Sequence, residues 1–360
     1  MGRPPVPRAL LLCFLVLPGG CLASGASPPP TTSAGPGAPA SSEDSADRAE
    51  PLTGISSAHV RGSPPPEGEW RLHHSDGSEA GLEAVVARAS EVDVIFVGER
   101  HGNAGTHALQ LRLLSMLIEE TRAEGRELVL GLEMFERDVQ PVLDEYLAEL
   151  ITEEHFLSVA RPWPNYSRDY RPVVEMARKE GIRVLATNTP RRYADRVSRL
   201  GPEALEALPS EARRHLPPLP FPGPSEAYRA EWEARMDALT HGHGASHEGQ
   251  YALVVQALWD ASMAHSIHEA LEARPSGTDE REGQDPPSPL VLHLTGTFHV
   301  ENRTGVPEAL RHYRPSVRDL VVTAWPVDTP KDFEAATGGV TLTGLADFVA
   351  LTPRDRLRDP

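Results

Sequence analysis

The sequence has few cysteines and almost no lysine, and its charge is strongly one-sided. Its two cysteines, Cys13 and Cys21, both lie close to the N-terminus of the 360-residue chain. Lysine occurs only at Lys179 and Lys331, so 33 of the 35 basic residues are arginine. Acidic residues outnumber basic ones by 52 to 35, which gives a net charge of −17. Because this charge would repel a polyanion, nucleic acid is excluded as a general partner.

The first 21 residues have the features of an export signal. Two arginines precede an apolar run from Ala9 to Leu17, and Pro18, Gly19, Gly20 and Cys21 follow it. Nine apolar residues are too few to span a bilayer. A cysteine after small residues resembles a bacterial lipobox, in which this cysteine is acylated and becomes the first residue of the mature protein. Pro18 stands where leucine is usual, which leaves plain secretion as the alternative. We predict a lipid anchor at Cys21 that holds the protein to a membrane of the bacterial cell envelope, facing the periplasm or the exterior.

Removal of this signal leaves at most one cysteine in the mature chain. Disulfides, thiol catalysis and cysteine-bound zinc are therefore excluded within the chain, and its chemistry must use His, carboxylate, Tyr or hydroxyl groups.

Residues 22–69 are rich in Pro, Ala, Ser and Gly and hold few large apolar side chains. Such a composition cannot bury enough surface to form a core, so we predict a disordered tether that leads into one domain over residues 70–360.

Short apolar segments alternate with amphipathic segments after residue 90. The predicted strands are Val92–Val97, Leu128–Leu132, Ile182–Ala186, Pro289–Leu294 and Asp319–Ala324, and the predicted helices are Ala104–Glu120, Val139–Leu150, Tyr170–Glu180 and Tyr251–Ala273. Gly181 is the expected stop of the third helix. Nearly uninterrupted apolar strands separated by helices indicate an α/β fold, with a mostly parallel sheet and helices on both of its faces.

About a hundred residues, 190–288, separate the third and fourth predicted strands and contain no strand candidate. They include a proline-rich break at 217–224, the sequence HGHGASHEG at 241–249 and a polar stretch at 275–288. A loop of this length is usually functional or disordered, and the helical periodicity of residues 251–273 argues against disorder. We therefore predict a helical insertion on the sheet.

Acidic and histidine side chains gather at the ends of three predicted strands. The first strand runs into Glu99 and His101, the second into Glu133 and the fourth into His299. Because functional groups of a parallel sheet collect at its carboxyl edge, we expect these four side chains to share one site. Such a set could bind Mn, Fe or Zn. The alternative is that these residues only cap helices, since the helix dipole favours a carboxylate near a helix N-terminus.

The two strand-end histidines stand in Gly-x-x-His motifs, at 98–101 and 296–299. Together with LEMFERDVQPVLDEYL, TNTPRR, QALWDASMA and GTFHVENRTGVPEALR, these motifs resemble the ChaN family of iron-regulated haem-binding lipoproteins over roughly residues 90–325. That family is grouped with the Tiki, TraB and erythromycin esterase proteins through paired motifs of this kind. The resemblance implies an α/β fold with a helical insertion, a role in haem or iron acquisition, and a homodimer that holds haem between helical parts of its subunits.

The resemblance also implies a second function for the strand ends. In Tiki-like relatives, residues matching Glu99, His101, Glu133 and His299 bind a divalent metal and support hydrolysis. In a hydrolase of this kind, Glu99 and Glu133 are also the candidates for the catalytic carboxylate. We rank an envelope-anchored haem carrier or store first, a hydrolase dependent on Mn, Fe or Zn second, and a scaffold without either activity third.

Haem iron accepts His or Tyr as a ligand, and the predicted insertion supplies both. We expect His241, His243 or Tyr251 to ligate the iron, across a dimer interface. Covalent attachment is excluded because the sequence has no Cys-x-x-Cys-His motif. His265 and His268 lie three residues apart in a predicted helix, and for these two we favour ordinary packing.

Overall fold

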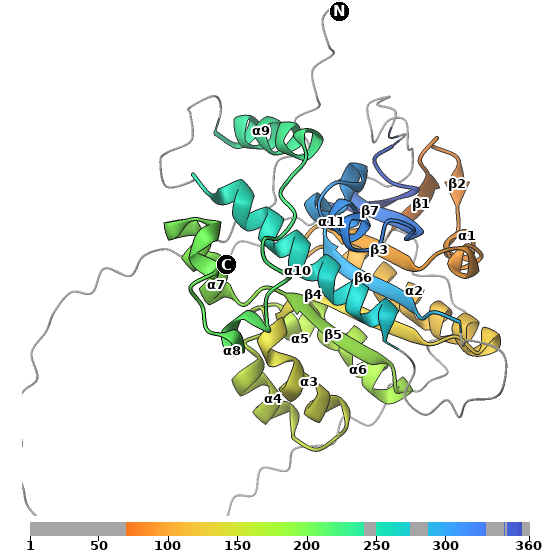
Figure 1. Ribbon diagram of the computed structural model, residues 1–360. Helices are drawn as coiled ribbons and strands as arrows, with labels where there is room; N and C mark the ends of the chain where they lie inside the picture. The colour runs from red at the N-terminus through yellow and green to blue at the C-terminus, as the bar shows by residue number, and fades with distance from the viewer. Residues whose placement is uncertain (1–69, 241–249, 274–286, 329–341, 343, 355–360) are drawn as a thin grey trace, which may run out of the picture. The chain divides into compact units, whose positions relative to one another are not determined.

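The computed structural model describes residues 70–240, 250–273, 287–328, 342 and 344–354. An eight-stranded sheet runs through this part of the chain, in the order β2-β1-β8-β7-β3-β6-β4-β5 (Figure 1). The strands are β1 (Arg71–His74), β2 (Glu79–Ala80), β3 (Val94–Glu99), β4 (Leu128–Glu136), β5 (Arg183–Asn188), β6 (Leu290–Gly296), β7 (Asp319–Val327) and β8 (Phe348–Pro353). The six strands from β8 to β5 are mutually parallel, and β1 is antiparallel to both of its neighbours. The predicted α/β fold with a mostly parallel sheet is confirmed.

Helices connect the strands. They are α1 (Leu82–Val86), α2 (Ala104–Glu124), α3 (Gln140–Leu147), α4 (Glu153–Ala160), α5 (Tyr166–Asp169), α6 (Arg171–Glu180), α7 (Arg191–Leu200), α8 (Ser210–Arg213), α9 (Glu226–Thr240), α10 (Ala252–Glu272) and α11 (Val306–Tyr313). The described residues also contain short 3-10 helices: η3 (Ala89–Glu91), η4 (Arg137–Val139), η5 (Pro202–Leu205), η7 (Thr297–His299) and η8 (Glu301–Arg303). Helix α6 ends at Gly181 as predicted, because Gly181 adopts the left-handed conformation at φ 67°.

The sheet is covered on both faces, because alternate residues of its strands are apolar on each side. In β3, Ile95 and Val97 belong to a core formed with α1, α2, α3, α4 and α6. Val94 and Phe96 point the other way and pack against α10 and α11. A strand that is buried on both faces is apolar at every position, which explains why these strands were recognisable as short apolar runs.

Helices α7 to α10 lie between β5 and β6, which is the place predicted for the helical insertion. Helix α10 packs on the sheet through Met263 and Ile267. Tyr193 and Val197 of α7 form a separate apolar cluster with Leu258 of α10. The insertion is therefore attached to the sheet mainly through α10, with α7 packed on the N-terminal half of that helix.

Several sequence-based predictions fall outside the described residues. They are the export signal with Cys21, the tether at 22–69, and the candidate haem ligands His241 and His243. Within the part of the chain that the structure describes, none of the helices is both long and apolar enough to cross a membrane.

Candidate functional site

The carboxyl ends of β3, β4 and β6 lie side by side, because β6 is hydrogen-bonded to both of the other strands. Glu99, the last residue of β3, is opposite Gly296, the last residue of β6. The register between β4 and β5 shifts between Leu132 and Glu136, and this irregularity contains Glu133. Such bulges commonly redirect a side chain at the edge of a sheet. We call Glu99, His101, Glu133, Gly296 and His299 the strand-end site; the structure brings all five together.

Glu99 is fully buried and its carboxylate is surrounded by donors. One oxygen accepts a hydrogen bond from His101 Nδ1 at 2.8 Å and another from the Tyr170 hydroxyl at 2.6 Å. The other oxygen accepts from Gln110 Nε2 at 2.6 Å. His107 lies 3.7 Å from the same oxygen. A buried carboxylate needs such compensation, and here it fixes the orientation of the His101 ring.

Glu133 and His299 form the other half of the strand-end site. Glu133 Oε2 accepts hydrogen bonds from the Thr295 hydroxyl at 2.6 Å and the Gly296 amide at 2.7 Å. Its second oxygen lies 3.7 Å from His299 Nε2. The opposite ring nitrogen of His299 donates to Asp260 of α10 at 2.6 Å. His299 is thus held between two carboxylates.

Gly296 keeps a space open between the two histidines. A Cβ atom at this position would lie 3.2 Å from His101 Nε2 and 3.5 Å from His299 Cδ2. Both rings therefore border the same point, and these two ring atoms can be no further apart than the sum of the two distances. The glycine of the other motif, Gly98, serves packing, because a Cβ atom there would lie 2.8 Å from a methyl group of Val300.

The protonation of the strand-end site follows from these contacts. Burial would raise the pKa of Glu99, but the hydrogen bond from His101 and the charge of His107 outweigh it and lower that pKa. Burial acts the same way on Glu133, and the nearby His299 and His101 lower its pKa. For His299, burial opposes the charged form, but Glu133 and Asp260 raise its pKa. The arrangement can hold ionised carboxylates beside imidazoles that carry protons, as acid–base chemistry requires.

The predicted metal-binding role of Glu99, His101, Glu133 and His299 is not supported by this arrangement. Among the described residues, no group of three His, Cys, Asp or Glu side chains is placed to hold a metal ion. The donor atoms are instead committed to one another, as in the pairs of Glu99 with His101 and of Glu133 with the Gly296 amide.

Asp260, Tyr170 and Gln110 form hydrogen bonds with residues of the strand-end site, and the sequence pattern did not place them there. Asp260 offers one signal, because it is an acidic residue in an otherwise apolar helix and a buried carboxylate requires a partner. The hydroxyl of Tyr228 in α9 donates a hydrogen bond to Asp260 at 2.6 Å. Its ring is buried, with 1% of its surface exposed.

The remaining predicted haem ligand, Tyr251, lies at the start of α10 and is partly exposed. Its hydroxyl and ring are packed beside Gly201, at 3.1 Å from the position of a Cβ atom there. His265 and His268 lie further along α10, where their rings contact Tyr313 of α11 at centroid distances of 5.3 and 6.0 Å. These contacts agree with the packing interpretation of the two histidines.

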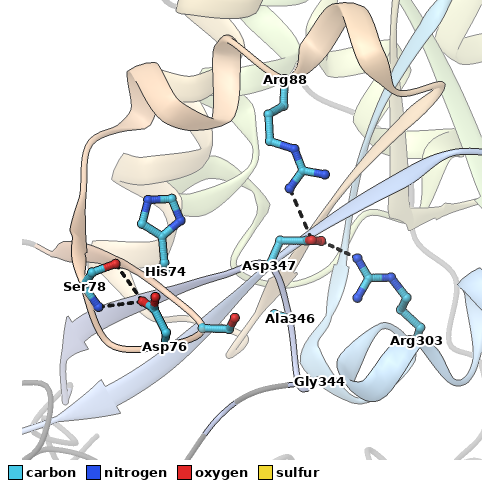
Figure 2. Close-up of a pocket in the computed structure, with 9 residues that line it drawn as sticks. His74, Asp76, Ser78, Arg88, Arg303, Gly344, Ala346 and Asp347 are labelled. Atoms are coloured by element: carbon cyan, nitrogen blue, oxygen red, sulfur yellow. Dashed lines mark hydrogen bonds and ion pairs between the residues drawn. The ribbon is translucent and has the colours of Figure 1, made fainter.

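A hollow of about 520 Å³ lies beside the β1–β2 turn, and no residue of the strand-end site lines it. Figure 2 shows Arg88 and Arg303 pointing from two sides at Asp347. The Asp347 carboxylate also accepts the Val321 amide of β7 at 2.8 Å. Because both guanidinium groups are already paired with a carboxylate, we interpret this cluster as a clamp between β7 and the segment before β8.

Comparisons with known proteins agree with this fold. A family model described as "Haem-binding uptake, Tiki superfamily, ChaN" matches residues 85–310. The solved structure "Cofacial heme binding to ChaN of Campylobacter jejuni" has a similar fold, with a TM-score of 0.56 and 16% identity over 79% of this chain and 98% of that chain. Protein RETICULATA-RELATED 5, chloroplastic, of Arabidopsis thaliana is 24% identical over 241 residues, which are 65% of this chain but only 31% of that protein. The match over 85–310 includes both Gly-x-x-His motifs and the whole insertion, and the chain therefore belongs to the ChaN family of haem-binding uptake proteins in the Tiki superfamily.

Proposed function

We propose that the protein binds haem in the bacterial cell envelope, where it acts as a lipid-anchored carrier or store in haem and iron acquisition. The observation that carries this proposal is the family match over residues 85–310. The envelope location rests on the export signal and on Cys21. A homodimer that encloses the haem between its insertions belongs to the same proposal.

The insertion offers a ligand beside apolar surface, which is what haem requires. Tyr251 is partly exposed at the start of α10. Val254 and Trp259 of α10 are partly exposed and pack against the buried apolar cluster that α10 forms with α7. A phenol oxygen at the margin of such a surface can face iron while the porphyrin covers apolar side chains. When bound, haem supplies an iron atom that a Tyr oxygen or a His nitrogen of the insertion ligates.

Helix α7 offers counter-charges for the two propionates of haem. It carries four arginines and a single acidic residue, Asp195, in a chain whose net charge is −17. Arg192 is already bound to Asp138, and Arg199 to Asp195. Arg191 is exposed at the start of the helix. Because arginine forms paired hydrogen bonds with carboxylates, this helix is the part of the insertion best suited to bind the acidic edge of haem.

A haemin titration of the full chain tests this proposal. We expect a saturable Soret band in the wild type. Tyr251→Phe or the double variant His241→Ala/His243→Ala should raise Kd by tenfold or more, equivalent to about 1.4 kcal/mol, and should shift the band. Tyr313→Phe is the matched control, because Tyr313 belongs to α11, outside the insertion. Unchanged spectra in both ligand variants would remove these residues as ligands, and no saturable binding by the wild type would remove the haem function.

The paired histidines of the strand-end site favour a second candidate function, hydrolysis of an ester or amide. Since the described residues offer no metal site, we propose this chemistry without a metal. One imidazole would take a proton from water as its oxygen attacks the carbonyl carbon. The other would give a proton to the leaving group as its bond to that carbon breaks. Positioned acids and bases of this kind each contribute about 10²–10⁴-fold to the rate.

Hydrolysis is tested with p-nitrophenyl acetate and p-nitroacetanilide. His101→Gln and His299→Gln should each lower kcat by about 10²-fold or more. His155→Gln is the control, because His155 is an exposed residue of α4. If the wild type releases nitrophenol or nitroaniline no faster than His299→Gln does, hydrolysis of these bonds at the strand-end site is excluded.

A further inference from the structure

The helical insertion reaches the strand-end site through Asp260 of α10. The side chain of Asp260 is buried, with 2% of its surface exposed. Its Oδ1 atom is hydrogen-bonded to His299 Nδ1 at 2.6 Å. Its Oδ2 atom accepts a hydrogen bond from the Tyr228 hydroxyl of α9 at 2.6 Å. Two helices of the insertion therefore meet on one carboxylate, and that carboxylate holds one ring of the strand-end site.

Close packing limits the movement of Asp260. A Cβ atom at Gly305 would lie 3.0 Å from Asp260 Oδ1 and 2.6 Å from the carbonyl oxygen of His299, so the chain after His299 passes directly over the carboxylate. The Tyr228 ring contacts Phe298, the neighbour of His299, at a centroid distance of 5.2 Å. A hollow of about 150 Å³ borders Tyr228 and Asp260. This volume is large enough to hold water.

Burial raises the pKa of Asp260, whereas the charge of His299 and the hydrogen bonds from His299 and Tyr228 favour its ionised form. As a carboxylate, Asp260 accepts hydrogen bonds and donates none, so both groups that face it carry a proton. One proton is on the Tyr228 hydroxyl, and the other is on Nδ1 of His299. Nε2 of His299 then faces Glu133 Oε1 at 3.7 Å and the space beside Gly296.

We propose that Asp260 is a positioning residue that keeps a proton on Nδ1 of His299, and that Tyr228 fixes the carboxylate which does so. For its consequence on catalysis this inference rests on the hydrolase proposed above, in which His299 exchanges protons at Nε2. The position of the proton can be measured without any substrate, so failure of the hydrolase and failure of this inference are separate results.

An asparagine at position 260 distinguishes this arrangement from simple packing. We expect the Tyr228 hydroxyl to keep donating, as it does to Asp260 Oδ2, so that it selects the amide oxygen and turns the amide nitrogen toward His299. The amide nitrogen is a hydrogen-bond donor, so Nδ1 of His299 must be unprotonated to accept from it. Asp260→Asn should therefore move the proton to Nε2, as the corresponding change does in a serine protease triad, where kcat falls about 10⁴-fold.

Removing the phenol should reverse this effect. In the double variant Asp260→Asn/Tyr228→Phe, the amide oxygen can turn to His299 while the amide nitrogen donates to water in the adjacent hollow. The proton then returns to Nδ1. A residue that only filled space would not produce loss of the proton in a single variant and its recovery in the double variant.

Proton NMR of the full chain labelled with ¹⁵N-histidine measures this directly. A low-field proton on Nδ1, assigned by its loss in His299→Gln, is expected in the wild type and in Tyr228→Phe. It should disappear in Asp260→Asn and return in the double variant. Asp195→Asn, a change at an exposed carboxylate of α7, is the control and should leave the signal unchanged.

Two results would overturn the inference. One is an Nδ1 proton that persists in Asp260→Asn, and the other is an identical His299 spectrum in the single and double variants. Should Asp260→Asn fail to fold, as judged by circular dichroism, Asp260→Ala still decides, because it removes the acceptor of the Nδ1 proton. Loss of the low-field Nδ1 signal in that variant supports the inference, and a signal unchanged from the wild type contradicts it.

Discussion

His293 lies in the middle of β6, and its burial makes the fold sensitive to acid. Its ring is fully buried, and burial lowers its pKa from 6.5 to about 3. The ring therefore stays neutral in the folded protein, whereas the unfolded chain takes up a proton below about pH 6.5. Because the unfolded state binds more protons in this window, the stability linked to His293 is complete above pH 6.5 and is lost as the pH falls toward 3.

The size of this effect follows from the pKa difference. At 1.36 kcal/mol for each pKa unit, the full contribution is about 5 kcal/mol, of which about 2 kcal/mol is lost between pH 7.5 and pH 5. His293→Gln removes the titrating ring. Urea unfolding at the two pH values should therefore show the wild type losing about 2 kcal/mol more than His293→Gln. His155→Gln removes an exposed histidine and should behave as the wild type. Equal losses in the wild type and His293→Gln would refute the reasoning.

Two further predictions concern packing and anchoring. Gly131→Ala places a Cβ atom 2.7 Å from Cδ2 of His293, and we expect a loss of about 1–3 kcal/mol in the free energy of unfolding. Gly223→Ala is its control, since a Cβ atom there meets no described atom within 4 Å; equal melting temperatures in the two variants would contradict the packing argument. Cys21→Ser should move the protein from the membrane fraction to the soluble envelope fraction, because acyl chains supply the anchor. A wild-type mature chain whose mass includes no acyl group would exclude that anchor.

The sequence was sufficient to assign four side chains to one site, because each of them directly follows a predicted apolar strand. These are Glu99, His101, Glu133 and His299. Parallel strands end at the same edge of a sheet, so residues separated by up to two hundred positions can be assigned to one place. Asp260 could not be placed in this way. Helical periodicity defines which face of α10 is buried, but it does not say which strand end that face meets.

The strands at the β1 edge of the sheet were also not predicted. β1 has the sequence RLHH and β2 only two residues, Glu79 and Ala80, so neither forms an apolar run. Their strand conformation depends on backbone hydrogen bonds to neighbouring strands, since β1 pairs with both β2 and β8. Strand preference of this kind comes from tertiary context, and local sequence does not contain it.

The most direct test of the account is an absorption titration of haemin, with metal analysis, on protein expressed without residues 1–21. The account predicts a saturable Soret band and iron that stays with the protein through gel filtration. A spectrum that remains the sum of free haemin and protein, with no iron retained, would contradict haem binding and leave the histidine pair of the strand-end site as the leading functional candidate.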